Sequence, residues 1–172
     1  MLIDLQKIFI RDLKVAYSKF KLFIMKNYLL CSFILITLNH FSQKTYFIDY
    51  RELADSLESA YQIPACIILS VAYIESGGGT SNVGRKLNNH FGIKGKNDVS
   101  ISGYQSSYKY YSTSRDSYIG FCTLVSSKKY YASMKGSKDH QKWLKTIASY
   151  GYAADANKWS TSVLSVLNKN CQ

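Results

Sequence analysis

The chain of 172 residues has little of what marks flexible, fibrous or multidomain proteins. It contains one proline and ten glycines, while 47% of its residues are hydrophobic and 15% are aromatic. Disordered and collagen-like chains are rich in proline or glycine and poor in apolar surface, so both classes are excluded. A domain usually takes roughly 100–200 residues, which leaves no room for two full domains. We therefore expect one packed domain.

Acidic residues are scarce and unevenly placed. The chain carries 22 Lys and Arg against 11 Asp and Glu, a formal net charge of +11, and Glu75 is its last glutamate. After Ser76, fourteen basic residues stand against four aspartates, a balance of +10. This charge predicts either an anionic partner, such as nucleic acid, an acidic membrane or cell-wall glycan, or a basic surface that only keeps the protein soluble.

The N-terminal region has an apolar run that is short for a membrane-spanning helix of about 20 residues. Residues 28–38 are eleven uncharged, mostly apolar residues that follow three lysines, which is the layout of a secretory signal. We therefore expect residues 1–42 to be an N-terminal extension with a signal peptide or anchor, cleaved near Ser42, and residues 43–172 to be the folded domain. Met25 is an alternative start, and a buried amphipathic helix is the alternative to a signal.

Cysteines at metal or redox spacing are absent. The four cysteines, Cys31, Cys66, Cys122 and Cys171, are too far apart for a CxxC pair. Loss of Cys31 with the signal would leave an odd number, which argues against a disulfide framework, so we expect Cys66 and Cys122 to be small core residues. No spaced set of His, Cys and Asp indicates a metal ion, and we expect neither a metal nor a cofactor.

Apolar residues recur at helical spacing through most of the domain. Residues 65–76 are apolar nearly all round, which predicts a central buried helix that ends at the following glycines. Between Phe91 and Tyr111 the spacing changes to short alternation, which predicts a small β-hairpin. The fold class is therefore mainly α (α+β), and further helices are expected over residues 45–61, from the Ser112–Ser114 cap onward, over 139–150, and around 159–167.

Glu75 stands on the apolar face of the predicted central helix. It follows Val71 by four residues and Ile68 by seven, so its carboxyl group is poorly solvated. Desolvation and the negative end of the helix dipole both raise the pKa of such a carboxyl group. An acid that stays protonated near neutral pH can protonate a leaving glycosidic oxygen. The alternative is a structural glutamate with a local hydrogen bond, followed by glycines that only stop the helix.

Three segments together resemble a known family. The helix Ile63–Gly77 with its Glu-Ser-Gly end, the stretch Asn88–Lys94 (NNHFGIK) and the stretch Gly151–Asp155 (GYAAD) resemble the glucosaminidase domain of bacterial peptidoglycan hydrolases, glycoside hydrolase family 73. The resemblance covers about residues 45–168. It implies a lysozyme-like helical domain with a small β-lobe over a glycan-binding groove, and cleavage of the bond after N-acetylglucosamine.

The resemblance also implies site residues. Glu75 falls on the family's general acid and Tyr152 on the tyrosine associated with its active site. Many members carry a second carboxylate in the β-lobe, where this chain offers only Asp98. Either Asp98 holds a water molecule, or the acetamido oxygen of the substrate attacks the anomeric carbon while Tyr152 steadies the polarised amide. We favour the second route because it needs one protein carboxylate.

Other residues near these motifs are candidates for binding substrate. They are Asn89, Phe91, Gly78 and Tyr110, where the glycine would let a polymer lie close to Glu75. Turn hydrogen bonds are the alternative role for Asn89, and sealing of the β-lobe is the alternative for Phe91. We expect His90 at the surface or as a capping residue.

The resulting prediction is an exported peptidoglycan hydrolase, an endo-β-N-acetylglucosaminidase that acts as a monomer in the periplasm or extracellular envelope. Its partner is the glycan strand and not nucleic acid, and it would contact a membrane only through an uncleaved N-terminal segment. A muramidase or lytic transglycosylase on the same scaffold and a non-catalytic wall-binding module are the alternatives.

Overall fold

The computed structural model describes residues 21, 24–27 and 43–171, and the chain divides into two units after Phe41. In the N-terminal unit, the described residues are helical and exposed, and Met25 is among them. The predicted signal run at 28–38, with Cys31, and the predicted cleavage near Ser42 lie outside the described residues. Within the part that is described, no helix is long and apolar enough to cross a membrane.

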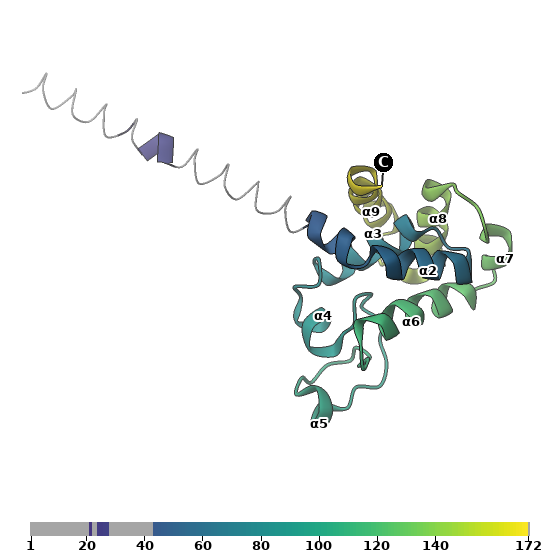
Figure 1. Ribbon diagram of the computed structural model, residues 1–172, viewed down its shortest axis with the longest axis horizontal. Helices are drawn as coiled ribbons and strands as arrows, with labels where there is room; N and C mark the ends of the chain where they lie inside the picture. The colour runs from purple at the N-terminus through teal and green to yellow at the C-terminus, as the bar shows by residue number, and fades with distance from the viewer. Residues whose placement is uncertain (1–20, 22–23, 28–42, 172) are drawn as a thin grey trace, which may run out of the picture. The chain divides into compact units, whose positions relative to one another are not determined.

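The C-terminal unit is built from helices, and Figure 1 shows their arrangement. Residues 43–49 are helical and lead into α2. The elements are α2 (Arg51–Tyr61), α3 (Ala65–Ser76), α4 (Asn82–Leu87), α5 (Val99–Ser102), α6 (Ser114–Ser126), α7 (Tyr131–Met134), α8 (His140–Ile147), η1 (Ala148–Tyr152) and α9 (Ala156–Asn170). The predicted helices at α2, α3, α6, α8 and α9 are confirmed, whereas α4, α5 and α7 were not predicted.

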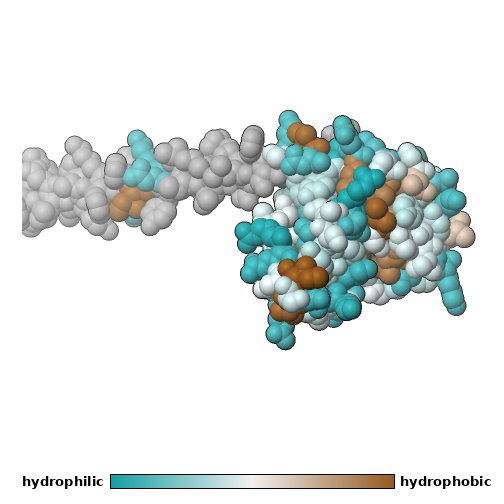
Figure 2. Space-filling model, turned by 60° about the horizontal axis from the view of Figure 1, so that its bottom comes forward, coloured by the Kyte–Doolittle hydropathy of each residue, from teal (hydrophilic) through white to brown (hydrophobic). Residues whose placement is uncertain are grey.

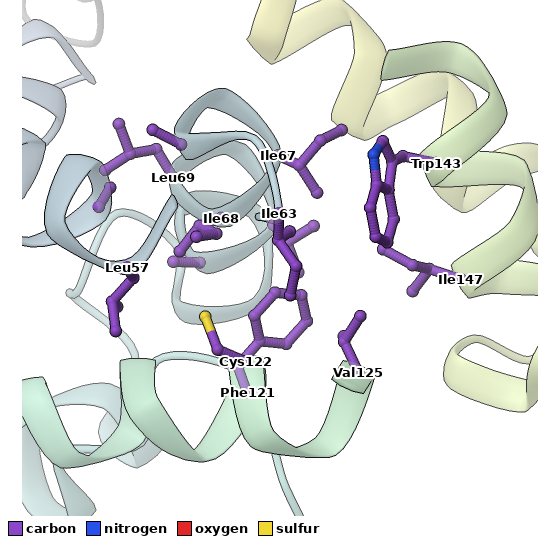
Figure 3. Packing of buried hydrophobic residues seen from close by; sticks show 14 of the residues in the cluster. Leu57, Ile63, Ile67, Ile68, Leu69, Phe121, Cys122, Val125, Trp143 and Ile147 are labelled. Atoms are coloured by element: carbon purple, nitrogen blue, oxygen red, sulfur yellow. The ribbon is translucent and has the colours of Figure 1, made fainter. Parts of the chain in front are cut away.

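Helix α3 is the centre of the packing. Eight of its twelve residues are buried, as its nearly all-round apolar sequence predicts. Figure 3 shows Ile67, Ile68 and Leu69 on this helix, with Phe121 of α6 on one side and Trp143 of α8 on another. A helix surrounded by partners on several sides is held in place along its length, so a group at its end has a fixed position.

The start of α6 illustrates how local sequence sets the helix ends. The Thr113 side chain accepts a hydrogen bond from the Asp116 backbone N–H at 3.2 Å, and the Asp116 carboxylate accepts one from the Thr113 N–H at 3.0 Å. This reciprocal pair is a capping box, which satisfies two backbone donors that a helix end leaves unpaired. The predicted cap at Ser112–Ser114 is thereby confirmed, with Thr113 as the capping residue.

The prediction of a β-hairpin in this lobe is wrong. Among residues 43–171 no strand forms, and only Lys94 and Tyr108 make an isolated antiparallel bridge. The Asp98 carboxylate accepts hydrogen bonds from the Ser100 backbone N–H at 3.0 Å and from its hydroxyl at 2.6 Å, which starts helix α5. Such local bonds between side chain and backbone compete with a strand ladder, and here they prevail.

Two of the alternating apolar residues of this lobe do not face a core. Val99 and Ile101 lie on α5 and are 45% and 65% exposed. Figure 2, in which the lower end of Figure 1 comes forward, shows brown apolar atoms gathered at that end of the domain. The alternation therefore misled the prediction, because neither residue has a buried face of a sheet to pack against.

A disulfide bond joins Cys66 to Cys171 across a sequence separation of 105 residues, with the Cα atoms 6.0 Å apart. The prediction that Cys66 is a free core residue is therefore wrong, while Cys122 is buried and free as predicted. The count misled because three cysteines allow one disulfide bond beside one free thiol, and in residues 43–171 that free thiol is Cys122. The bond ties the first turn of α3 to the residue after α9.

Loss of this disulfide should destabilise the domain. In the chain-entropy model, a loop of roughly 100 residues contributes up to about 4.7 kcal/mol. The double variant Cys66→Ser, Cys171→Ser should therefore unfold at a lower temperature than the oxidised wild type, measured by circular dichroism. Added dithiothreitol should lower the unfolding temperature of the wild type and leave that of the variant unchanged. Equal unfolding temperatures without reductant would show that the bond contributes nothing.

Candidate active site

Glu75 lies in the last turn of α3, where the start of α9 meets it. The indole Nε1–H of Trp159 donates a hydrogen bond to Glu75 Oε1 at 2.6 Å. The carboxyl group is partly buried, and burial raises its pKa above the ordinary value, while the hydrogen bond from Trp159 lowers the pKa in part. The pKa of Glu75 is therefore shifted upward, toward the protonated form that donates a proton.

Sequence reasoning missed Trp159 as a member of the site. The two residues are 84 positions apart, and Trp159 was expected only as part of a helix. The helices α3 and α9 run antiparallel, because the disulfide joins Cys66 to Cys171 at one end of the pair and Glu75 meets Trp159 at the other. A buried carboxylate needs a hydrogen-bond donor, so the sequence indicated that Glu75 has one. Nothing in the sequence indicated that the donor is Trp159.

Tyr152 lies beside this pair. Its ring centroid is 5.3 Å from that of Trp159, and its hydroxyl donates a hydrogen bond to the Phe91 carbonyl at 2.9 Å. Burial raises the pKa of the Tyr152 hydroxyl well above its ordinary value, and the charge of Glu75 raises it further. The structure therefore brings Glu75 and Tyr152 to one place, with a neutral tyrosine next to the acid.

The turn at Gly92 borders the other oxygen of Glu75. A Cβ atom at Gly92 would lie 3.5 Å from Glu75 Oε2 and 3.8 Å from Cε1 of Tyr108. The backbone φ of Gly92 is +60°, in the left-handed region that favours glycine. The stretch that follows Asn88 thus passes directly over the carboxyl group.

Asn89 and Phe91 hold that turn in place. Asn89 is fully buried, and its Nδ2 donates to the carbonyls of Ile93 and Lys109, both at 2.8 Å. Phe91 is 2% exposed and stacks on Phe121 at 4.3 Å between ring centroids. These contacts are those of the alternative roles, turn bonds for Asn89 and sealing for Phe91. Contact of either residue with substrate stays a prediction.

The structure does not bring Asp98 to Glu75. Asp98 is exposed at the start of α5, and Figure 1 shows α5 at the opposite end of the domain from α9. Hydrogen bonds from Ser100 lower the pKa of the Asp98 carboxyl group. Asp98 is therefore an ionised cap of α5, remote from the acid.

The two remaining candidates are Gly78 and Tyr110. Gly78 follows α3, and a Cβ atom there would lie 2.9 Å from Cε2 of Tyr73, so the missing side chain makes room for that ring. Tyr110 is partly buried, and its backbone N–H donates to the Lys96 carbonyl at 3.2 Å. Substrate contact at Gly78 and Tyr110 stays a prediction.

His90 belongs to a buried polar network, which corrects the expectation of a surface or capping residue. It is 3% exposed; its Nδ1 pairs with the Tyr46 hydroxyl at 2.7 Å and its Nε2 with the Ser114 hydroxyl at 3.1 Å. The Tyr46 hydroxyl also pairs with that of Tyr118 at 2.9 Å. The network fastens the helical residues 43–49 and the Gly92 turn to α6.

A pocket lies against Tyr152 on the side of α6 and α8. Tyr150 in its wall is 56% exposed. The lining residues are Leu124, Val125, Lys128, Tyr130, Ile147, Tyr150, Gly151 and Tyr152. The pocket thus offers aromatic rings and one lysine next to the site. In residues 43–171, no three His, Cys, Asp or Glu side chains are grouped to hold a metal ion.

Comparison with known proteins identifies relatives of this arrangement. A family model, Glucosaminidase, described as mannosyl-glycoprotein endo-beta-N-acetylglucosaminidase, matches residues 51–172. No curated protein sequence matches significantly. The predicted helical fold is confirmed by solved structures that are 18–19% identical to the chain.

Three of these structures have a TM-score of 0.59. A peptidoglycan hydrolase from Sphingomonas sp. A1 is 18% identical, and the match covers 73% of this chain and 87% of that chain. The catalytic domain of the autolysin Auto from Listeria monocytogenes is 19% identical, with 74% and 84% covered. The glycoside hydrolase domain of Salmonella typhimurium FlgJ is 18% identical, with 74% and 96% covered.

The buried histidine predicts how stability depends on pH. Burial lowers the pKa of His90 to about 4 from 6.5, so between pH 6.5 and 5 the unfolded chain binds a proton that the folded chain does not. The free energy of unfolding should therefore fall with decreasing pH, by up to about 1.4 kcal/mol per pH unit. Urea unfolding at several pH values measures this slope.

Two variants separate His90 from other groups. His90→Gln should flatten the slope between pH 6.5 and 5, whereas His140→Gln, which changes the other histidine of residues 43–171, should keep the slope of the wild type. A His90→Gln protein with the wild-type slope would contradict the assignment.

Proposed function

The chain belongs to the glucosaminidase family, and we propose that it is a peptidoglycan hydrolase that cleaves the β-1,4 bond after N-acetylglucosamine. The observation that carries the proposal is the carboxyl group of Glu75. The motif resemblance assigns it the family's general-acid role. Burial raises its pKa, and Trp159 donates a hydrogen bond to it at 2.6 Å. A general acid requires this combination of a raised pKa and a fixed position.

In the proposed reaction, Glu75 gives its proton to the glycosidic oxygen as the bond between that oxygen and C1 breaks. The acetamido oxygen of the same N-acetylglucosamine forms a bond to C1 from the other face and becomes part of a cyclic cation. Water then attacks C1 and reopens this ring, and the Glu75 carboxylate takes a proton from that water. The products are a new reducing end and a free hydroxyl group, and Glu75 is protonated again.

The position of Asp98 supports this substrate-assisted route over a water held by Asp98. Asp98 is at the far end of the domain from α9 and is engaged with Ser100. Tyr152, by contrast, lies next to Glu75 and Trp159. A hydroxyl group there can act on the charge that develops on the acetamido group, in exchange for its bond to the Phe91 carbonyl.

The surface charge and the disulfide support a role outside the cytoplasm. The excess of basic residues after Ser76 suits an anionic wall polymer, and Lys128 lies in the pocket against Tyr152. Disulfides such as Cys66–Cys171 persist in oxidising compartments and are rare in the cytosol. We therefore include export to the cell envelope, through the N-terminal segment, in the proposal.

Replacement of the acid tests the proposal. Glu75→Gln keeps the side-chain volume but cannot supply the proton, so hydrolysis of purified peptidoglycan should fall by roughly 10²–10⁴-fold. Turbidity loss and zymography measure the rate. The variant should be at least as stable as the wild type at pH 7, because it removes a poorly solvated carboxyl group.

Three matched variants complete the experiment. Glu52→Gln, on the exposed side of α2, should retain wild-type activity, and Asp98→Asn should lose little. Tyr152→Phe should slow turnover, since it removes the hydroxyl next to the acid. An active Glu75→Gln protein would overturn the catalytic assignment. A large loss at Asp98→Asn with none at Tyr152→Phe would overturn the substrate-assisted route.

A further inference from the structure

The two oxygens of the Glu75 carboxyl group have different surroundings. Oε1 accepts the hydrogen bond from the Trp159 indole at 2.6 Å. An indole N–H is a donor and never an acceptor, so Oε1 has to present a lone pair to it. In a protonated carboxyl group the carbonyl oxygen is a stronger acceptor than the hydroxyl oxygen, so the bond from Trp159 favours the carbonyl at Oε1 and the proton on Oε2.

The space next to Oε2 is kept open by the lack of a side chain at Gly92. A Cβ atom there would lie 3.5 Å from Oε2 and 3.8 Å from Cε1 of Tyr108, so it would occupy the space between these two groups. Gly92 itself is fixed, because its neighbour Phe91 stacks on Phe121 and Asn89 brackets the turn. The absent methyl group thus leaves one face of Oε2 uncovered.

Trp159 is held as firmly as the turn on the other side. Its ring packs against Tyr152, and its helix α9 is tied to α3 at the far end by the disulfide between Cys66 and Cys171. Because both helices are anchored, the indole N–H keeps its direction toward Oε1. A group fixed in this way loses little entropy when it forms the bond.

Glu75 receives its hydrogen bond from Trp159, and two tyrosines lie nearby. Tyr152 from η1 interacts electrostatically with Glu75, and Tyr108 from the loop after Gly92 borders the same space beside Gly92 as Oε2. Burial raises the pKa of Glu75, and the Trp159 bond lowers it. The donor therefore limits how far burial raises the pKa, and the reaction needs Glu75 both as an acid and as a base.

We propose that Trp159 is a positioning residue that orients the Glu75 carboxyl group so that Oε2 carries the transferred proton, and that Gly92 keeps Oε2 open to the glycosidic oxygen. This inference rests on the proposed function and adds to it the atom that donates the proton and the two residues that select it.

Replacement of Trp159 by phenylalanine tests the positioning role. Trp159→Phe keeps an aromatic ring but removes the N–H donor, so kcat should fall by about 10-fold to 100-fold while KM changes little. The alkaline limb of the pH profile of kcat should move to higher pH. The sign follows because loss of a donor that stabilises the carboxylate raises the pKa of Glu75, and the acid stays protonated to a higher pH.

Trp143→Phe is the matched control. Trp143 is the other of the two tryptophans in the chain, and its indole also donates one hydrogen bond, to the Ser137 carbonyl at 2.9 Å. This variant should lose stability but keep the alkaline limb of the wild type. A limb that stays in place in Trp159→Phe, or moves equally in both variants, would show that Trp159 is only structural.

A titration of Glu75 itself gives a readout that does not depend on activity. The chain has three glutamates, so carboxyl ¹³C labelling resolves Glu75 from Glu52 and Glu58 by NMR. Its pKa should be higher in Trp159→Phe than in the wild type, and an equal or lower value would overturn the inference. An inactive wild type with this pKa difference would overturn the proposed function and keep the role of Trp159.

Gly92→Ala and Gly103→Ala test the open face of Oε2. Both glycines have nearly the same φ, +60° and +62°, so both variants carry the same backbone strain. A Cβ atom at Gly103 would have nothing within 4 Å, whereas one at Gly92 would lie against Oε2. Gly92→Ala should lose activity about 10-fold or more, with Gly103→Ala near wild type. Equal activity in both variants would refute the role of Gly92.

Discussion

The hydrogen bond from Trp159 to Glu75 is the contact on which the site depends. It joins the end of α3 to the start of α9, and the disulfide between Cys66 and Cys171 joins the other ends of the same helices. Burial of a carboxyl group costs stability, and burial of the apolar residues around α3 offsets that cost. The site therefore trades some stability for a carboxyl group with a raised pKa and a fixed position.

The lobe beside α3 holds the turn at Gly92 in a fixed position without a β-sheet. The Asn89 side chain donates hydrogen bonds to two backbone carbonyls around its turn, Phe91 stacks on Phe121, and His90 is hydrogen-bonded to Tyr46 and to Ser114. These contacts fasten the turn to α6, so that Gly92 lies at Oε2 of Glu75. A short loop can be as well placed as a strand when its polar groups are satisfied by buried partners.

The sequence predicted the features that depend on neighbouring residues, such as the bounds of a helix and the face on which a side chain lies. The apolar run up to Ser76 gave the bounds of α3, and its spacing put Glu75 on the buried face. The partner Trp159 and the disulfide of Cys66 could not be read in the same way, because they bring together residues 84 and 105 positions apart. The lobe was mispredicted because alternation around Val99 favours a strand only where a core covers one face, and here the cap of α5 prevails.

The bond that the proposed hydrolase cleaves is identified most directly by the reducing ends that it releases. Purified peptidoglycan, digested with the wild-type protein and reduced with borohydride, can be analysed by mass spectrometry of the released fragments. A glucosaminidase with Glu75 as its acid predicts reduced N-acetylglucosamine at the new ends. New ends of N-acetylmuramic acid, or of its anhydro form, would contradict that activity and indicate a muramidase or a lytic transglycosylase on the same scaffold.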